Sequence, residues 1–199
     1  MKAFNRQPSK AAIPRTPFDW LQPAIQLRVL LLSLLPLSAL MRAIIVTNTP
    51  LENPSAPYGM VSFQLAGSLD LSRAIINSWD QHTRVLAALN LGIDYLYMVA
   101  YAFTIGLACV LLSRRFVNRS TLLTLAGVGL SWAMLAALLL DAAENYFLIG
   151  LLMGEQYTLW PVLARWCALP KFGLVLAALA YLALGGVLAL ILAVKRNPS

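Results

Sequence analysis

Polar side chains that could do chemistry stand inside two of the most apolar stretches of this sequence. In the first stretch, Asp94 is followed by Tyr97, Tyr101 and Thr104. These spacings place all four side chains on one face of an α-helix. A polar face directed toward lipid would be costly, so we expect this one to face a helical bundle or a water-filled cavity.

The second group lies in a later apolar stretch, where Asp141, Glu144 and Asn145 share one helical face. Lys171 opens the last apolar stretch at a similar expected depth in the membrane. We therefore predict one polar cluster close to the outer membrane surface. Its members are Asp94, Asp141, Glu144, Asn145 and Lys171, with Tyr95, Tyr97 and Tyr101 around them.

Such a cluster has functional and structural interpretations. It could hold the cationic head of an amphiphile, coordinate a divalent cation through oxygen ligands, or pass protons between carboxylates. It could equally be an interhelical ion pair with amide support that fixes the bundle. The catalytic residues of any reaction are unknown from the sequence. The single His82 and the two cysteines exclude a bis-histidine haem or a Cys/His zinc site within this chain, so we predict no cofactor and name no metal site.

The composition indicates which solvent these residues meet. Of the 199 residues, 60% are hydrophobic and only 12% are charged, which is typical of a membrane protein rather than a soluble domain. We predict an all-α fold, a four-transmembrane-helix bundle with an outer amphipathic helix in the first extracytoplasmic loop. Residues 1–24 are expected to form a basic, irregular cytoplasmic arm, and residues 25–199 the transmembrane domain. The spans are expected at about 28–46, 89–113, 120–145 and 171–194, with the outer loop at 47–88.

The first apolar run, residues 29–46, has a second interpretation. Its basic flank, apolar centre and small residues around Ala39 loosely fit a secretory signal peptide. We favour a retained span, because the apolar stretch continues past Arg42, which can extend toward the outer surface. Phe18 and Trp20, just before this run, are expected at the level of the lipid headgroups.

Several segments outside the spans carry local structural signals. Residues 60–66 are expected to form a short strand or an interfacial turn. Ser68 is a predicted N-cap of an amphipathic helix that lies on the membrane surface or over the mouth of the bundle, and Ser120 is a predicted N-cap of the third span. Residues 154–169 are expected to form a short interfacial helix that Pro170 separates from the last span.

Basic residues determine the expected orientation. Ten of the 15 Lys and Arg residues fall on the side that carries both termini and the turn at 114–119, and five fall on the other side. The positive-inside rule therefore predicts that both termini are cytoplasmic, N-in and C-in. The same clustering accounts for the net charge of +7 without nucleic acid as a partner. Membrane lipids and other membrane protein subunits are the expected partners.

Four runs of the chain carry distinctive motifs, at 56–67, 74–79, 91–97 and 140–145. Together they resemble an uncharacterised family of small four-span bacterial integral membrane proteins, which combine an Asp in the second span with an Asp-x-x-Glu-Asn run in the third. The resemblance implies a four-span layout in a bacterial inner (plasma) membrane, and it implies no activity. Family members often carry an acid where this chain has Gln64, so no acidic role is implied at that position.

These observations favour a non-enzymatic role. We expect either an accessory subunit of a larger complex or a binder of a lipid-like ligand, with the acidic cluster near the outer leaflet. The alternative is a small intramembrane enzyme in which Asp94 and either Asp141 or Glu144 form an acid/base pair acting on a lipid or isoprenoid. An enzyme needs a cavity that reaches the carboxylates, whereas a subunit can be packed solid there.

Overall fold

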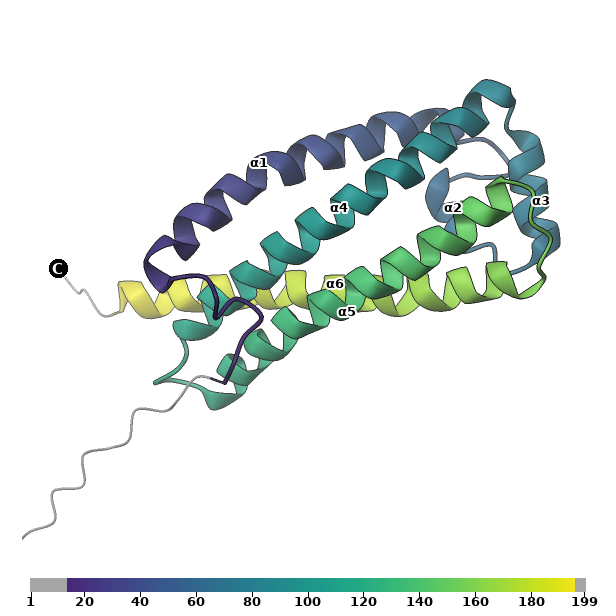
Figure 1. The fold of residues 1–199 in the computed structure, drawn as a ribbon. Coiled ribbons are helices and arrows are strands. Elements are labelled where there is room, and N and C mark those ends of the chain that lie inside the picture. The colour runs from purple at the N-terminus through teal and green to yellow at the C-terminus, as the bar shows by residue number, and fades with distance from the viewer. Residues whose placement is uncertain (1–13, 196–199) are drawn as a thin grey trace, which may run out of the picture.

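Four long helices make up most of the chain (Figure 1). The computed structural model describes residues 14–195. The long helices are α1 (Pro23–Asn48), α4 (Gln81–Arg114), α5 (Thr121–Leu152) and α6 (Leu159–Val194). Each is long and apolar enough to cross a bilayer. The protein is therefore a multi-pass membrane protein with the all-α four-helix bundle that the sequence predicts.

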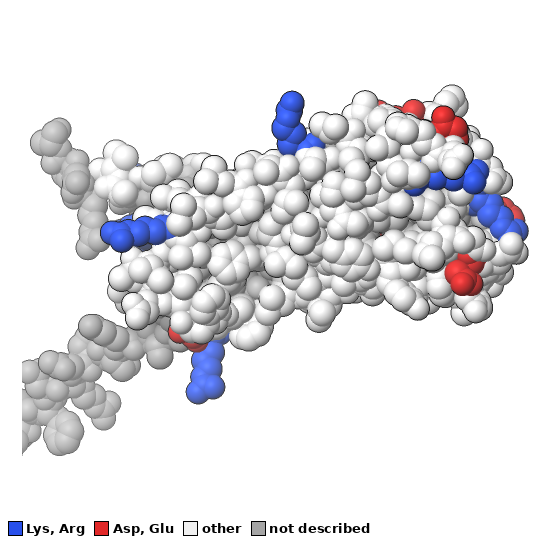
Figure 2. All heavy atoms as spheres, turned by 45° about the horizontal axis from the view of Figure 1, so that its top comes forward, with Lys and Arg blue, Asp and Glu red and all other residues white. Residues whose placement is uncertain are grey.

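The two ends of the bundle differ. One end, here called the lid end, carries the short helices η1 (Thr49–Leu51), α2 (Met60–Gln64) and α3 (Leu69–Ser78) (Figure 1). The other, here called the terminal end, carries residues 14–22, the turn at 115–120 and the end of α6. On the face shown in Figure 2, most acidic side chains lie at the lid end, and few charged side chains are visible along the middle of the bundle.

Helix α4 is the centre of the bundle, because it packs against α1, α5 and α6, while α5 and α6 also pack extensively on each other. Small residues make these contacts close. A side chain at Gly127 would collide with the Tyr181 hydroxyl, and one at Gly150 would collide with the Trp160 ring. The glycines thus allow α6 to lie against α5 along much of its length.

Helix α1 packs on α4 and has few contacts with α5 and α6. Two polar contacts hold it in register, one from Thr104 Oγ1 to Ser33 Oγ at 3.0 Å and one from Asn90 Nδ2 to Thr47 Oγ1 at 2.7 Å. Its outward face is apolar, with Leu35 68% exposed. A face of this kind is suited to contact with lipid.

Polar caps define where the helices begin. Both predicted N-caps are confirmed, since Ser68 Oγ accepts a hydrogen bond from Leu71 N–H and Ser120 Oγ accepts one from Leu123 N–H, each at 3.3 Å. A further cap, Asp80, was not predicted. Its Oδ1 accepts from Thr83 N–H at 2.7 Å, so α4 begins well before the expected start of the second span.

Two local predictions are wrong. The expected strand or turn at 60–66 is the helix α2, which follows Gly59 in a positive-φ conformation (φ 57°). The expected break at Pro170 is also absent, because α6 runs through it as one helix. Ala164 and Ala168 before the proline are fully buried, so packing holds the helix on α5 despite the one lost backbone hydrogen bond.

Of the two aromatic residues before α1 that were expected at the headgroup level, one is exposed and the other is packed into the bundle. Trp20 is 71% exposed, as expected for a headgroup-level ring, but Phe18 is only 5% exposed. The Phe18 ring packs edge-on against Phe103 at 5.3 Å and approaches the open backbone at Gly106. Phe18 therefore anchors this segment to α4. The rest of the predicted cytoplasmic arm, residues 1–13, lies outside the described residues.

Candidate functional site

The centre of the polar cluster is a buried ion pair between α5 and α6. Lys171 Nζ lies 2.8 Å from Asp141 Oδ1 and 2.6 Å from Glu144 Oε2. Asp141 and Glu144 stand on consecutive turns of α5, so one ammonium reaches both carboxylates. Tyr101 on α4 donates its hydroxyl to Asp141 Oδ2 at 2.9 Å. Exposed fractions of 4%, 2% and 0% for Lys171, Asp141 and Glu144 remove this group from solvent.

Asp94 forms the edge of the cluster. Its Oδ2 accepts a hydrogen bond from Asn145 Nδ2 at 2.8 Å, which links α4 to α5. Unlike the ion-paired carboxylates, Asp94 is only half-buried. It has no salt bridge to any residue within 14–195. An amide carries no net charge, so this hydrogen bond does not neutralise the Asp94 carboxylate.

The cluster carries more negative than positive charge. Three carboxylates, from Asp94, Asp141 and Glu144, face the single ammonium of Lys171. Two buried oxygens, Glu144 Oε1 and Asn145 Oδ1, have no hydrogen-bond partner within the described residues. Buried charge of this kind is stable only when it is paired, protonated or joined by a cation. The arrangement is therefore suited to holding a proton or a positively charged group.

Helix geometry places the cluster near one membrane boundary. Asp94 lies 20 residues before Arg114 at the end of α4, and Asp141 lies 20 residues after Thr121 at the start of α5. At about 1.5 Å per residue, this separation is about 30 Å, the thickness of the hydrocarbon layer. When the terminal end of the bundle lies at one polar boundary, the cluster lies at the other.

Aromatic rings flank the half-buried acid. The rings of Tyr97 and Tyr101 are 5.5 Å apart at an interplanar angle of 58°, and they lie one and two turns from Asp94 on the same helix. Tyr95 turns toward α5 instead, where its hydroxyl lies 3.4 Å from the Ala142 carbonyl. Tyrosine faces beside a carboxylate are a recurring means of binding ammonium groups.

Lys171 also has an aromatic neighbour that sequence reasoning did not find. Its ammonium lies 4.8 Å from the centre of the Phe172 ring. Adjacent residues on a helix normally point in different directions, so no spacing rule predicts this cation–π contact. It gives the buried ammonium a third favourable contact in addition to the two carboxylates.

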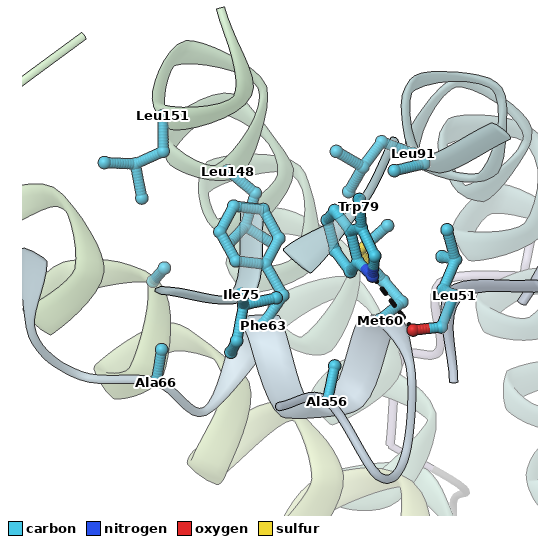
Figure 3. Close-up of a cluster of buried hydrophobic side chains, with 12 residues drawn as sticks. Leu51, Ala56, Met60, Phe63, Ala66, Ile75, Trp79, Leu91, Leu148 and Leu151 are labelled. Atoms are coloured by element: carbon cyan, nitrogen blue, oxygen red, sulfur yellow. Dashed lines mark hydrogen bonds between the residues drawn. The ribbon is translucent and has the colours of Figure 1, made fainter. Parts of the chain in front are cut away.

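At the lid end, next to the polar cluster, a group of buried hydrophobic side chains fills the space between the short helices and the bundle (Figure 3). The apolar face of α3 is directed into the bundle, where Ile75 and the neighbouring Trp79 pack with Leu91 of α4 and Leu148 of α5. Trp79 Nε1 donates to the Leu51 carbonyl at 2.9 Å, which ties the end of α3 to the end of η1. The amphipathic helix therefore lies over the mouth of the bundle, one of the two positions expected from the sequence.

Polar contacts fasten the lid at its edge. Arg73 on α3 donates to Gln156 Oε1, in the loop between α5 and α6, at 2.6 Å. Gly67 has a positive φ of 69° and lies against the Arg165 side chain of α6, where a Cβ atom would come within 2.8 Å of that side chain. The lid is thus attached to the helices that supply Glu144 and Lys171.

Thr104, the fourth member of the predicted polar face, belongs elsewhere. It bonds Ser33 of α1 rather than any member of the cluster. Cys109 and Cys167 are both free thiols. Among residues 14–195, no group of three His, Cys, Asp or Glu side chains is arranged to hold a metal ion.

The structure brings the seven predicted site residues into one neighbourhood, and their functional role stays a prediction. Comparisons with protein-family models, with curated proteins and with solved structures find no match for this chain. The resemblance to a bacterial four-span family also stays a prediction.

Proposed function

We propose that this membrane protein binds an amphiphile with a cationic head, and that Asp94 receives the ammonium group. The observation that carries the proposal is the unbalanced charge of the cluster. Lys171 lies within 2.8 Å of two carboxylates on α5, whereas the hydrogen-bond partner of Asp94 within residues 14–195 is the uncharged Asn145 amide. A bound ammonium at Asp94 would supply the missing positive charge.

Access favours an amphiphile that enters sideways from the bilayer. Asp94 and Tyr97 are half-buried, while Asp141 and Glu144 are buried. The lid covers the end of the bundle, whereas the Asp94 side chain keeps part of its surface exposed. The boundary depth of Asp94 suits a headgroup whose tails stay in the hydrocarbon layer.

The enzyme alternative fits these contacts less well. General acid/base catalysis requires both carboxylates within hydrogen-bond reach of the substrate. Asp141 already accepts from Tyr101 and pairs with Lys171, and Glu144 is fully buried. A ligand that reaches only the exposed edge of the cluster would meet Asp94 alone. Binding therefore suits the geometry better than acid/base chemistry.

The proposal is tested by titrating purified protein in neutral maltoside micelles with dodecyltrimethylammonium, using dodecanol as a probe of equal chain length without charge. Native mass spectrometry then counts the bound molecules. We expect Asp94→Asn to weaken ammonium binding by about 10-fold to 100-fold, since a hydrogen bond or contact to a charged group contributes roughly 1.5–3 kcal/mol. Dodecanol binding should not change.

Asp70→Asn is the matched control, because Asp70 is an exposed acid at the same end of the molecule, in the first turn of α3. It removes the same charge without touching the cluster. Equal loss of binding in both variants would reduce the effect to general surface charge. Equal affinity of the wild-type protein for the ammonium and the alcohol would refute the proposal.

We propose in addition that the lid end faces the extracytoplasmic side of a bacterial inner membrane. The basic residues Arg114, Arg115, Arg119 and Lys195 at the terminal end support this orientation through the positive-inside rule. Labelling a cysteine introduced at Asn118, which lies exposed in the 115–120 turn, with a membrane-impermeant maleimide tests it. Rapid labelling of intact cells at that position would reverse the orientation.

A further inference from the structure

An open pocket lies at the terminal end, far from Asp94. Its volume is about 530 Å³, which is within the range of small-molecule sites. Three polar side chains line it: Arg119 in the turn, Ser120 at the start of α5, and Lys195 at the end of α6. Arg119 and Lys195 are exposed and are not engaged in a salt bridge within residues 14–195.

The other walls of the pocket are apolar. They are formed by Phe116, Leu123, Leu188 and Leu192. Phe116 is almost fully buried and forms a fixed surface, whereas Leu188 is 38% exposed. Phe116 packs against α6 at Gly185, where an added Cβ would lie 3.0 Å from the Leu112 side chain and 3.6 Å from the Phe116 ring. Two basic groups thus lie at the edge of an apolar surface, which the leucine side chains of α6 extend along that helix.

The electrostatic environment of this pocket favours an anion. The start of α5 contributes the positive end of a helix dipole and the end of α6 the negative end of another, so the side chains of Arg119 and Lys195 give the pocket its positive charge. Ser120 Oγ accepts from Leu123 N–H, which leaves its O–H free to donate. Of the eight acidic residues in the chain, Asp19 alone lies at this end, and its carboxylate already accepts two hydrogen bonds from Thr16. The other seven acids lie in the lid-end segments or in the halves of α4 and α5 next to the lid end.

We propose that this pocket binds an anionic phospholipid, with the phosphate between Arg119 and Lys195 and an acyl chain along Leu188 and Leu192. The leucine side chains favour a lipid over a soluble phosphate, because an acyl chain can pack against them and a small anion cannot. The position agrees, since the pocket lies at the membrane boundary opposite the Asp94 cluster. The inference stands independently of the ammonium site at Asp94.

The test measures binding of phosphatidylglycerol and phosphatidylcholine to protein in nanodiscs or micelles. The variant Arg119→Gln/Lys195→Gln removes both basic groups from the pocket. We expect it to weaken phosphatidylglycerol binding by about 30-fold, because each basic side chain near an anionic headgroup contributes roughly 5-fold. Phosphatidylcholine binding should change little.

The control variant Arg114→Gln/Arg115→Gln removes two positive charges from the same end of the bundle without altering the pocket lining. It should retain most of the phosphatidylglycerol affinity. Equal loss in the two double variants would overturn the proposal in favour of a diffuse basic surface. Competition by sn-glycerol 3-phosphate at the same concentration as the lipid would overturn it in favour of a soluble phosphate site. Thermal unfolding followed by circular dichroism, with a transition like that of the wild-type protein, shows that each variant is folded.

Discussion

Removing the ammonium of Lys171 is the most direct perturbation of the buried cluster. Lys171→Met keeps an unbranched side chain and deletes only the charge. Asp141 and Glu144, which lie 2.8 Å and 2.6 Å from Lys171 Nζ, then lose their common partner. Neither carboxylate can turn to water, since they are 2% and 0% exposed. The variant therefore leaves two uncompensated charges inside the bundle.

The expected cost follows from that burial. Breaking a buried ion pair by removing one partner destabilises a protein by roughly 3–5 kcal/mol. For a chain of about 150–250 residues, each kcal/mol lowers the melting temperature by roughly 2–4 °C. We expect Lys171→Met to lower the melting temperature by about 6–20 °C. The loss should be smaller when the carboxylates are neutralised in the same molecule.

The assay is thermal unfolding in a neutral detergent, followed by circular dichroism at one protein concentration. The triple variant Asp141→Asn/Glu144→Gln/Lys171→Met removes all three charges while keeping similar volumes. It should recover most of the lost stability, because a neutral group of similar shape avoids the cost of an unpaired charge. A Lys171→Met protein that melts within about 2 °C of wild type would refute the reasoning. A triple variant as unstable as the single one would assign the loss to packing instead.

Two further predictions concern the lid end. Trp79→Phe should destabilise the lid by roughly 1–3 kcal/mol and speed hydrogen exchange across α3, because the Leu51 carbonyl loses the indole N–H that it accepts at 2.9 Å. Exchange rates in α5 should not change, and a uniform increase would contradict a local effect. Hydrogen bonds from Thr83 hold the pKa of Asp80 below its usual value, so the cap is present at neutral pH and is lost only as the pH falls through that lowered pKa. Asp80→Asn should remove this pH dependence of Thr83 amide exchange while keeping the amide protected at pH 7, and unchanged pH dependence would show that another group protects it.

Much of the cluster could be predicted, because the membrane thickness determines the depth of each residue in the bilayer and the helix period determines the helix face on which it lies. Asp94 and Asp141 each lie 20 residues from the terminal end of their helices. Two such residues on neighbouring helices must lie at one level, and the cost of polar groups in lipid turns them inward. The spacing of three residues between Asp141 and Glu144 likewise predicted that both carboxylates lie on one face of their helix.

The choice of partners within the cluster could not be predicted. Depth does not determine the rotation of each helix, so the sequence could not show that Lys171 pairs with α5 while Asp94 pairs with the Asn145 amide. Rotation depends on side-chain packing over the whole interface, such as Gly150 against Trp160. These contacts join residues from different helices and have no local signature.

Local signals failed where tertiary contacts outweigh them. Pro170 normally ends a helix, yet the buried residues on both sides hold α6 straight through it. The position of Phe18 just before an apolar run is typical of a ring at the headgroup level. The absence of a side chain at Gly106 nevertheless leaves space for it in the bundle. The early start of α4 at Gln81 follows from the Asp80 cap, in a stretch too polar for a hydropathy window to include.

The structural and functional interpretations of the cluster fall on different residues. Lys171, Asp141 and Glu144 are mutually paired and buried, which is the pattern of an element that fixes α5 against α6. Asp94 is half-buried, and its hydrogen-bond partner within residues 14–195 is the Asn145 amide, which could also donate to the carbonyl oxygen of an Asn side chain at position 94. Asp94→Asn should therefore leave the melting temperature within about 2 °C of wild type while it abolishes the preference for ammonium. A fall comparable to that of Lys171→Met would make Asp94 part of the structural ion-pair network and leave no charge available for a ligand.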